Sequence, residues 1–500
     1  MTRDVDLLIR GGLVVTVDPQ NRVLSDGAVA VHAGRIVVVG PTAEVTAQVS
    51  AAQTLDAHGK LVMPGIVDAY HHAGHGMIKG VWRGGLGWPS TPLYFHATTP
   101  SWWYADGLMT AIERLKFGVT TGVSVVGATP ARADHPSFAL ASAKGVADAG
   151  LRAFIAVGPP DPFLNLGHDN TGAFWDGDRA ERRPFTYEQT IEVTKEFFSE
   201  LRGWGNPRLE PMFAVPYLLG MSPDKGPGSH HHRYSPADAR LMRDKALEAR
   251  RIANDFGVRI QTHGARGTFE WAESAFGAGV LDDVLGPDVF FAHANALTDA
   301  DIDIIRRTGC GIAAVPYGPW NVALGPCPIL KLLQNGVPLA ITTDGAAPYF
   351  HSDPFDHLHH AQFLQWMDHH DQTVVPAGRV VRLVTIEAAA LLGLERELGS
   401  LEPGKQADII LIDRQQPHLT PFVSPANMIA WYVRGNDVDT VIVGGQVVMQ
   451  GRKMLRVDEA RALAAAEEEI AKSFARLDVQ AYLEHTHDYW QGWQEKAQPK

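Results

Sequence analysis

The chain has 500 residues and a formal net charge of −12, from 44 Lys and Arg against 56 Asp and Glu. This acidic balance argues against nucleic acid and against an anionic membrane surface as partners, since both are negatively charged themselves. The hydrophobic fraction of 45% is ordinary for a globular protein, and no apolar run is long enough to cross a bilayer. We therefore expect a small-molecule substrate, with no nucleic acid and no membrane as partner.

The cysteines and the start of the chain bear on its location. Only Cys310 and Cys327 occur, without a CxxC spacing, so neither a disulfide framework nor a thiolate zinc site is expected. Residues 1–12 mix acidic and basic side chains and lack the apolar segment and cleavage site of a signal peptide. These features predict a cytoplasmic protein.

Both ends of the chain have the pattern of short β-strands. The segments concerned are rich in β-branched residues and punctuated by glycine and Asp-Gly turns, at 6–18, 26–40, 53–65, 399–413 and 438–454. Two such flanks around a different middle predict one small β-sandwich domain formed by residues 1–60 and 396–455.

The middle of the chain alternates strands with helices. Eight candidate strands are apolar on entry and polar or Gly/Pro-rich on exit, at 61–72, 118–127, 151–159, 209–217, 258–264, 288–295, 310–318 and 337–345. Continuous apolar runs suit parallel strands buried on both faces. Capping patterns predict helix starts at Ser235 and Thr298. The expected fold class is α/β, with a (β/α)8 TIM-type barrel over 61–395 and a helical extension over 456–500.

Ionisable residues gather where the predicted barrel strands end, which is where such barrels place catalysis. His71, His72 and His75 end the first strand, and His263, His293 and Asp344 end the fifth, sixth and eighth. Imidazole nitrogens with one carboxylate suit a borderline divalent ion such as zinc, with positions left for water. The pattern therefore predicts a metal-dependent site.

Several motifs resemble the amidohydrolase superfamily, in particular its single-metal branch of chlorotriazine hydrolases and cytosine and guanine deaminases. They are Met-Pro-Gly-Ile-Val-Asp at 63–68, Ile-Thr-Thr-Asp-Gly at 341–345, and the segments 387–393 and 398–408. We expect one divalent ion, held mainly by His72, His263 and Asp344, with His293 as a further ligand or a close hydrogen-bond partner. Zinc is expected first, with iron, cobalt and manganese as alternatives. The resemblance also implies a homo-oligomer, a dimer or larger, by analogy alone.

The first departure from this family pattern is Tyr70, which stands where the first metal-binding histidine belongs. Strand alternation points His71 away from the face that residues 70 and 72 share. Either Tyr70 lines the site without strong coordination, which we favour, or a local bulge lets His71 or His75 replace the missing ligand. The sequence has a weaker likeness to phenylurea and thiocarbamate hydrolases, which tolerate a non-histidine at this position.

The second departure is Arg266. The resembling branch commonly reads His-x-x-Glu after the fifth strand, with a glutamate that shuttles protons in deamination, but here the run is His263-Gly264-Ala265-Arg266. Arginine can polarise a carbonyl or hold a carboxylate. The plain alternative is an exposed residue at a helix start.

Residues for substrate contact are expected around the mouth of the barrel. The loop after the first strand is dense in aromatics, which either pack the loop or line a pocket. We predict substrate contacts from Tyr70, His75, Trp82, Trp88 and Tyr317.

The predicted function is hydrolysis of a non-peptide C–N bond, in an amide, urea or carbamate of a small aromatic substrate, by metal-activated water. Asp344 accepts the proton of that water, while His293 and Arg266 stabilise the oxyanion or protonate the leaving nitrogen. One alternative is a deaminase or dechlorinase of an N-heterocycle. Another is a catalytically silent barrel kept for binding, which the Tyr70 departure leaves open.

Overall fold

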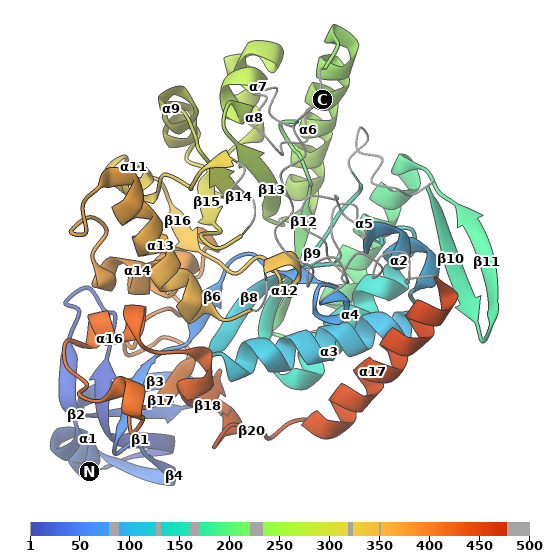
Figure 1. Cartoon of the computed structure of the whole chain (residues 1–500). Coiled ribbons are helices and arrows are strands. Elements are labelled where there is room, and N and C mark those ends of the chain that lie inside the picture. The colour runs from blue at the N-terminus through green and yellow to red at the C-terminus, as the bar shows by residue number, and fades with distance from the viewer. Residues whose placement is uncertain are drawn as a thin grey trace, which may run out of the picture.

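The computed structural model describes residues 2–79, 90–126, 132–160, 170–220, 234–318, 324–349 and 352–477. Its central feature is a parallel barrel of eight strands in the order β16-β15-β14-β13-β12-β9-β8-β6 (Figure 1). These strands are β6 (Ile66–Asp68), β8 (Val119–Val126), β9 (Arg152–Val157), β12 (Leu209–Ala214), β13 (Ile260–Ala265), β14 (Val289–Asn295), β15 (Gly311–Ala314) and β16 (Leu339–Ile341). Each lies within a segment predicted as a barrel strand or extends one residue past it, which confirms the α/β barrel.

The barrel closes between its first and last strands. A parallel bridge joins His71 to Asp344, and the short strand β7 (His72–Ala73) pairs with β8. Small and branched side chains such as Val67, Val123 and Ala313 fill the interior and are fully buried. The C-terminal strand ends therefore sit above a packed, dry core.

Helices follow the strands and cover the barrel. The main ones are α3 (Pro100–Lys116), α4 (Pro136–Ala149), α5 (Tyr187–Gly203), α6 (Pro236–Phe256), α7 (Thr268–Phe276), α8 (Ala278–Val284), α9 (Asp299–Thr308), α11 (Ile329–Gln334), α13 (Pro354–His369), α14 (Ala377–Leu383) and α15 (Ile386–Leu391). Both predicted capping boxes are present, Ser235 with Asp238 at α6 and Thr298 with Asp301 at α9. Local sequence therefore sets where these two helices start.

The chain ends form a second, nine-stranded sheet in the order β20-β19-β18-β17-β5-β1-β2-β3, with β4 beside β1. Its strands are β1 (Arg3–Val15), β2 (Val23–His32), β3 (Arg35–Pro41), β4 (Val49–Asp56), β5 (Lys60–Pro64), β17 (Ile409–Asp413), β18 (Val438–Val443), β19 (Gln446–Gln450) and β20 (Lys453–Met454). The sheet is continuous, and residues from both chain ends, such as Leu7 and Ile409, share one apolar core.

One strand prediction was wrong. The segment 61–72 was expected to be a single barrel strand, but its first part is β5, which pairs with β1 and β17 in the second sheet. The chain enters the barrel after Gly65, where a Cβ would lie 2.2 Å from the Thr120 side chain. The domain limits 1–60 with 396–455, and 61–395, remain predictions, and β5 lies across the first of them.

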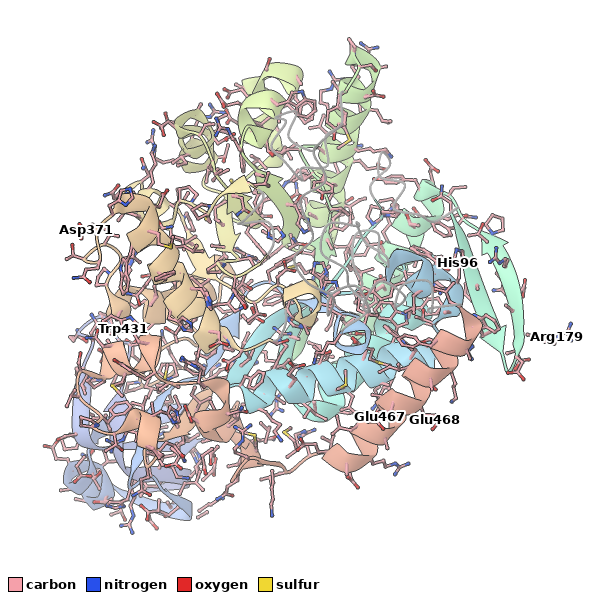
Figure 2. The ribbon with its side chains drawn as sticks, viewed as in Figure 1. His96, Arg179, Asp371, Trp431, Glu467 and Glu468 are labelled. Carbon is pink, nitrogen blue, oxygen red and sulfur yellow. The ribbon has the colours of Figure 1, made fainter. Side chains whose placement is uncertain are left out.

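The remaining elements of the described chain are short helices, turns and one hairpin. They are α1 (Thr42–Gln48), α2 (Ser90–Ala97), α12 (Ala346–Tyr349), α16 (Pro425–Trp431), the 3-10 turns Gly76–Ile78, Pro417–Leu419 and Gly435–Asp437, and the hairpin β10 (Thr171–Asp176) with β11 (Arg179–Pro184). The sequence did not predict this hairpin, whose second strand is exposed along its length and carries Arg179 away from the body (Figure 2).

The predicted C-terminal extension begins with α17 (Glu459–Arg476), which runs alongside α3 (Figure 1). Glu469 is buried in this contact and accepts hydrogen bonds from Thr99 and Ser101 at 3.3 and 3.1 Å. Residues 478–500 lie outside the described part of the chain. Within that described part, no helix is long and apolar enough to span a membrane.

Candidate active site

The side chains predicted from the strand ends meet at the mouth of the barrel. His72 Nε2 lies 3.4 Å from Asp344 Oδ1, and His293 Nε2 lies 3.6 Å from Asp344 Oδ2. The Tyr70 hydroxyl lies 2.5 Å from His72 Nε2 and 2.6 Å from His263 Nε2. The first, fifth, sixth and eighth strands thus bring three imidazoles, a carboxylate and a phenol together.

The backbone holds this cluster by joining the first strand to the eighth. The Asp344 amide donates to the Tyr70 carbonyl at 3.0 Å, and the His72 amide donates to the Asp344 carbonyl. Asp68 lies beneath and accepts hydrogen bonds from the Thr343 amide at 3.0 Å and from the Arg114 guanidinium at 3.1 Å. Buried hydrogen bonds of this kind fix the position of residues 70–72 against Asp344.

Two of the clustered residues have left-handed backbone conformations, which non-glycine residues rarely adopt. The φ angle is 69° at His293 and 65° at Asp344. The pairing of β13 with β14 is also irregular at His293. Gly264 pairs with His293 and Ala265 pairs with Asn295, so that one residue of β14 is skipped. Strained residues of this kind concentrate at functional sites, where the surrounding structure enforces them.

His263 is oriented by the loop that follows β12. Its Nδ1 lies 2.8 Å from the Pro216 carbonyl oxygen, which can only accept a hydrogen bond. Nδ1 therefore carries the proton of the neutral ring, and Nε2 presents a lone pair to the site.

The two other histidines of the first strand differ in position. His71 faces away from Tyr70, as strand alternation predicted, and its Nδ1 lies 3.0 Å from Thr343 Oγ1. His75 is fully buried and stacks on His72 with ring centroids 4.5 Å apart. The glycine of the Asp-Gly pair makes room for it, because a Cβ on Gly345 would lie 2.3 Å from His75 Nδ1.

Burial keeps three of the histidines neutral. It lowers the pKa of His263 to about 4 and, with neighbouring imidazoles, the pKa of His293 and His75 well below the ordinary value. Burial, with Asp344 and Tyr217 nearby, raises the pKa of the Tyr70 phenol well above its ordinary value. At neutral pH the rings of His263, His293 and His75 are therefore uncharged, and the Tyr70 phenol keeps its proton.

The other predicted site residues are Arg266, Tyr317, Trp82 and Trp88. Arg266 is exposed and its backbone amide pairs with the Asn295 carbonyl, as expected of a residue at a helix start. Tyr317 stacks on His360 with centroids 4.2 Å apart. Trp82 and Trp88 lie outside the described residues.

Sequence reasoning missed two features near the site. Tyr217, three residues after β12 ends at Ala214, lies with its ring centroid 5.6 Å from that of His263. It is the last residue of the predicted strand 209–217, so the rule that found the histidines could have found it. The second is His357, which is fully buried beside Tyr317, because α13 packs this face against the barrel.

A buried carboxyl behind the first strand predicts a pH effect on stability. Asp106 of α3 accepts a hydrogen bond from the Gly74 amide, and burial raises its pKa from 3.8 to about 7. Because the folded pKa exceeds the unfolded one, its charging opposes folding as pH rises between about 4 and 7. The Asp106→Asn variant cannot ionise at this position and should not lose stability in this way. Its free energy of unfolding minus that of wild type should therefore increase by up to about 1.4 kcal/mol for each pH unit between pH 4 and 7. Urea unfolding of both proteins at pH 5 and pH 8 measures this difference in stability. The same difference at both pH values would contradict the raised pKa of Asp106.

A comparison with known protein families identifies the family of this chain. The model of the amidohydrolase family matches residues 61–448, so the chain belongs to the amidohydrolase family, as its motifs suggested. It is accordingly a hydrolase of the kind that acts on carbon–nitrogen bonds other than peptide bonds.

Two relatives are similar over nearly the whole chain. A 5-methylthioadenosine/S-adenosylhomocysteine deaminase of Desulforudis audaxviator is 31% identical, over 92% of this chain and 97% of its own. A 5'-deoxyadenosine deaminase of Methanococcoides burtonii is 28% identical, over 95% of this chain and 99% of its own.

Solved structures share the fold. An adenosine deaminase from Xanthomonas campestris with bound zinc superposes with a TM-score of 0.78 at 22% identity, covering 95% of this chain and all of that one. A zinc complex of the atrazine chlorohydrolase of Arthrobacter aurescens gives 0.70 at 20% identity, covering 93% of this chain and 100% of that one. The likeness confirms the barrel with its added sheet.

The donor chemistry of the site fits a divalent ion. Ligands of tetrahedral zinc lie ~3.3 Å from each other, close to the 3.4 and 3.6 Å that separate His72 and His293 from Asp344. Among the described residues, however, no three His, Cys, Asp or Glu side chains stand in an arrangement that would hold a metal ion. The Tyr70 hydroxyl lies between two of the nitrogens. The residue types therefore suit the ion, while the Tyr70 hydroxyl contacts two of the nitrogens that would hold it.

Proposed function

We propose that the chain hydrolyses a non-peptide C–N bond of a small molecule at the cluster of Tyr70, His72, His263, His293 and Asp344. The observation that carries this proposal is the convergence of His72 and His293 on the two oxygens of Asp344, at 3.4 and 3.6 Å. Groups held on rigid strand ends in this way suit proton transfer between a water molecule and a leaving group.

Each residue of the cluster has a proposed role. Asp344 takes the proton of the attacking water, and His293, neutral and beside it, hydrogen-bonds the developing oxyanion or relays that proton from Asp344 to the leaving nitrogen. His72, His263, His293 and Asp344 are the residues that would hold one divalent ion, zinc in first place. That ion would supply a water of lowered pKa and polarise the scissile group.

The substrate class is an amide, urea or carbamate with an aromatic part. Arg266 stands where the resembling deaminases carry a proton-shuttling glutamate, and it is exposed. Next to His263, the Tyr217 ring lies with its centroid 5.6 Å from that of the imidazole and offers an aromatic face to a substrate ring.

Deamination of a nucleoside-like N-heterocycle is the second candidate. It is favoured by the relatives, which are deaminases of adenine-containing compounds. Both reactions break a C–N bond with water, and they differ in the nitrogen released. Deamination releases ammonia, whereas cleavage of an N-aryl amide, urea or carbamate releases an arylamine.

The nitrogen product therefore tests the proposal. The purified full chain, loaded with zinc, is incubated with aryl amides, aryl ureas and aryl carbamates, and separately with 5'-deoxyadenosine and adenosine. We expect arylamine release from the first group that is lost in Asp344→Asn. Release of ammonia from the nucleosides, without release of an arylamine from the first group, would show that deamination is the reaction. No turnover of either group would favour a silent binding barrel.

A homo-oligomer of two or more chains and a cytoplasmic location are kept as proposals. Exposed apolar side chains on α13, Phe363 and Met367, offer surface for subunit contact at 54% and 58% exposure. Sedimentation of the purified chain would settle the oligomeric state.

A further inference from the structure

The Tyr70 phenol has an unusual place at the centre of the cluster. Its ring is fully buried and meets those of His72, His263 and His293 edge to face, with centroids 5.0, 5.5 and 5.8 Å away. Its oxygen reaches hydrogen-bond distance of two imidazole nitrogens at once, at 2.5 and 2.6 Å.

The protons of this arrangement can be assigned. Because His263 Nδ1 donates to the Pro216 carbonyl, its Nε2 is bare and accepts the single phenol proton. The contact of the phenol oxygen with His72 then requires a proton on His72 Nε2, which donates to that oxygen. The phenol therefore uses both nitrogens, one as acceptor and one as donor.

A metal ion needs the lone pairs of the same two nitrogens. His72 Nε2 must lose its proton, and His263 Nε2 must give up the hydrogen bond from the phenol, before both can direct their lone pairs at the ion. The phenol oxygen is also too close to them to be a fellow ligand, since two ligands of one tetrahedral ion lie ~3.3 Å apart. Hydrogen bonding to Tyr70 and coordination of an ion are thus alternatives in this arrangement.

We propose that the Tyr70 hydroxyl competes with the divalent ion for His72 Nε2 and His263 Nε2, and so sets the metal affinity of this chain low. The inference rests on the metal-binding residues of the proposed function. The replacement of the family's first histidine is then more than the loss of one ligand, since the phenol also satisfies two others when no ion is bound. Removing the hydroxyl alone should therefore strengthen ion binding.

The test is zinc affinity, measured on the full, metal-stripped chain by competition with a chromophoric chelator. We expect Tyr70→Phe to bind one zinc at least about tenfold more tightly than wild type, because two neutral hydrogen bonds no longer oppose the ion. Tyr70→His, which adds a nitrogen ligand, should bind more tightly still. Tyr104→Phe is the matched control, since its hydroxyl bonds Asp148 on the outer helices, and its affinity should equal that of wild type.

Each outcome decides the inference. Equal or weaker zinc binding by Tyr70→Phe would overturn it, and would make Tyr70 a bystander or a ligand while the proposed hydrolase stands. If Tyr70→Phe does not fold, as seen by near-UV circular dichroism, the comparison of Tyr70→His with wild type decides, and equal affinities would overturn it. Absence of zinc binding in all variants would overturn it together with the metal role, whereas the nitrogen-release assay judges the hydrolase separately.

Discussion

Asp344→Asn should lower kcat/KM by about 10³-fold while leaving the fold intact, because it removes the group that accepts the proton of the attacking water. The amide has nearly the same shape as the carboxyl and the backbone bonds between residue 344 and residues 70 and 72 do not involve the side chain. The loss should therefore appear in turnover and not in thermal unfolding. Steady-state kinetics on the substrate found by nitrogen release, with a melting curve for each protein, provides the measurement.

Glu270→Gln is the matched control for this change. This carboxylate lies on α7, which follows β13; it accepts a hydrogen bond from Thr298 at 2.9 Å and is exposed. Its replacement should change kcat/KM by less than about threefold. A wild-type kcat/KM in Asp344→Asn, or an equal loss of kcat/KM in Glu270→Gln, would contradict the role given to Asp344.

Asp68→Ala should destabilise the fold by about 3–5 kcal/mol, because it leaves the Arg114 guanidinium buried without its counter-ion. Asp68 is 1% exposed and also accepts from Thr343 Oγ1 at 2.8 Å and Thr342 Oγ1 at 2.6 Å. Those bonds close the barrel beneath the site, so the damage should extend to activity. Chemical unfolding followed by fluorescence measures the change.

An exposed ion pair provides the control for Asp68→Ala. Lys144→Ala removes the partner of Asp148 on the surface of α4, and surface ion pairs contribute only about 0–1 kcal/mol. If Asp68→Ala costs no more than Lys144→Ala, the buried network does not hold the barrel closed as described.

The strand ends were predictable because two features of the sequence agree. Continuous apolar runs marked the buried parallel strands, and the residue after each run had to emerge at the same rim. That rule placed His263, His293 and Asp344 together, and strand alternation separated Tyr70 and His72 from His71 correctly.

What the sequence left undetermined depends on tertiary contacts. The choice between a lining role and a bulge at Tyr70 required the position of its hydroxyl, which depends on how far His72 and His263 lie from each other across the barrel. His357 has polar neighbours in sequence, so only the packing of α13 shows it to be buried. The division of segment 61–72 between two sheets depends on the pairing of β5 with β17, which lies over 300 positions away in the chain.

The most direct test of the account is turnover in water enriched in ¹⁸O, with products weighed by mass spectrometry. If water breaks the C–N bond at this cluster, the product carries one ¹⁸O on the carbon that lost its nitrogen, and Asp344→Asn forms almost none of it. A product without the heavy oxygen, or one formed equally by Asp344→Asn, would contradict the central claim.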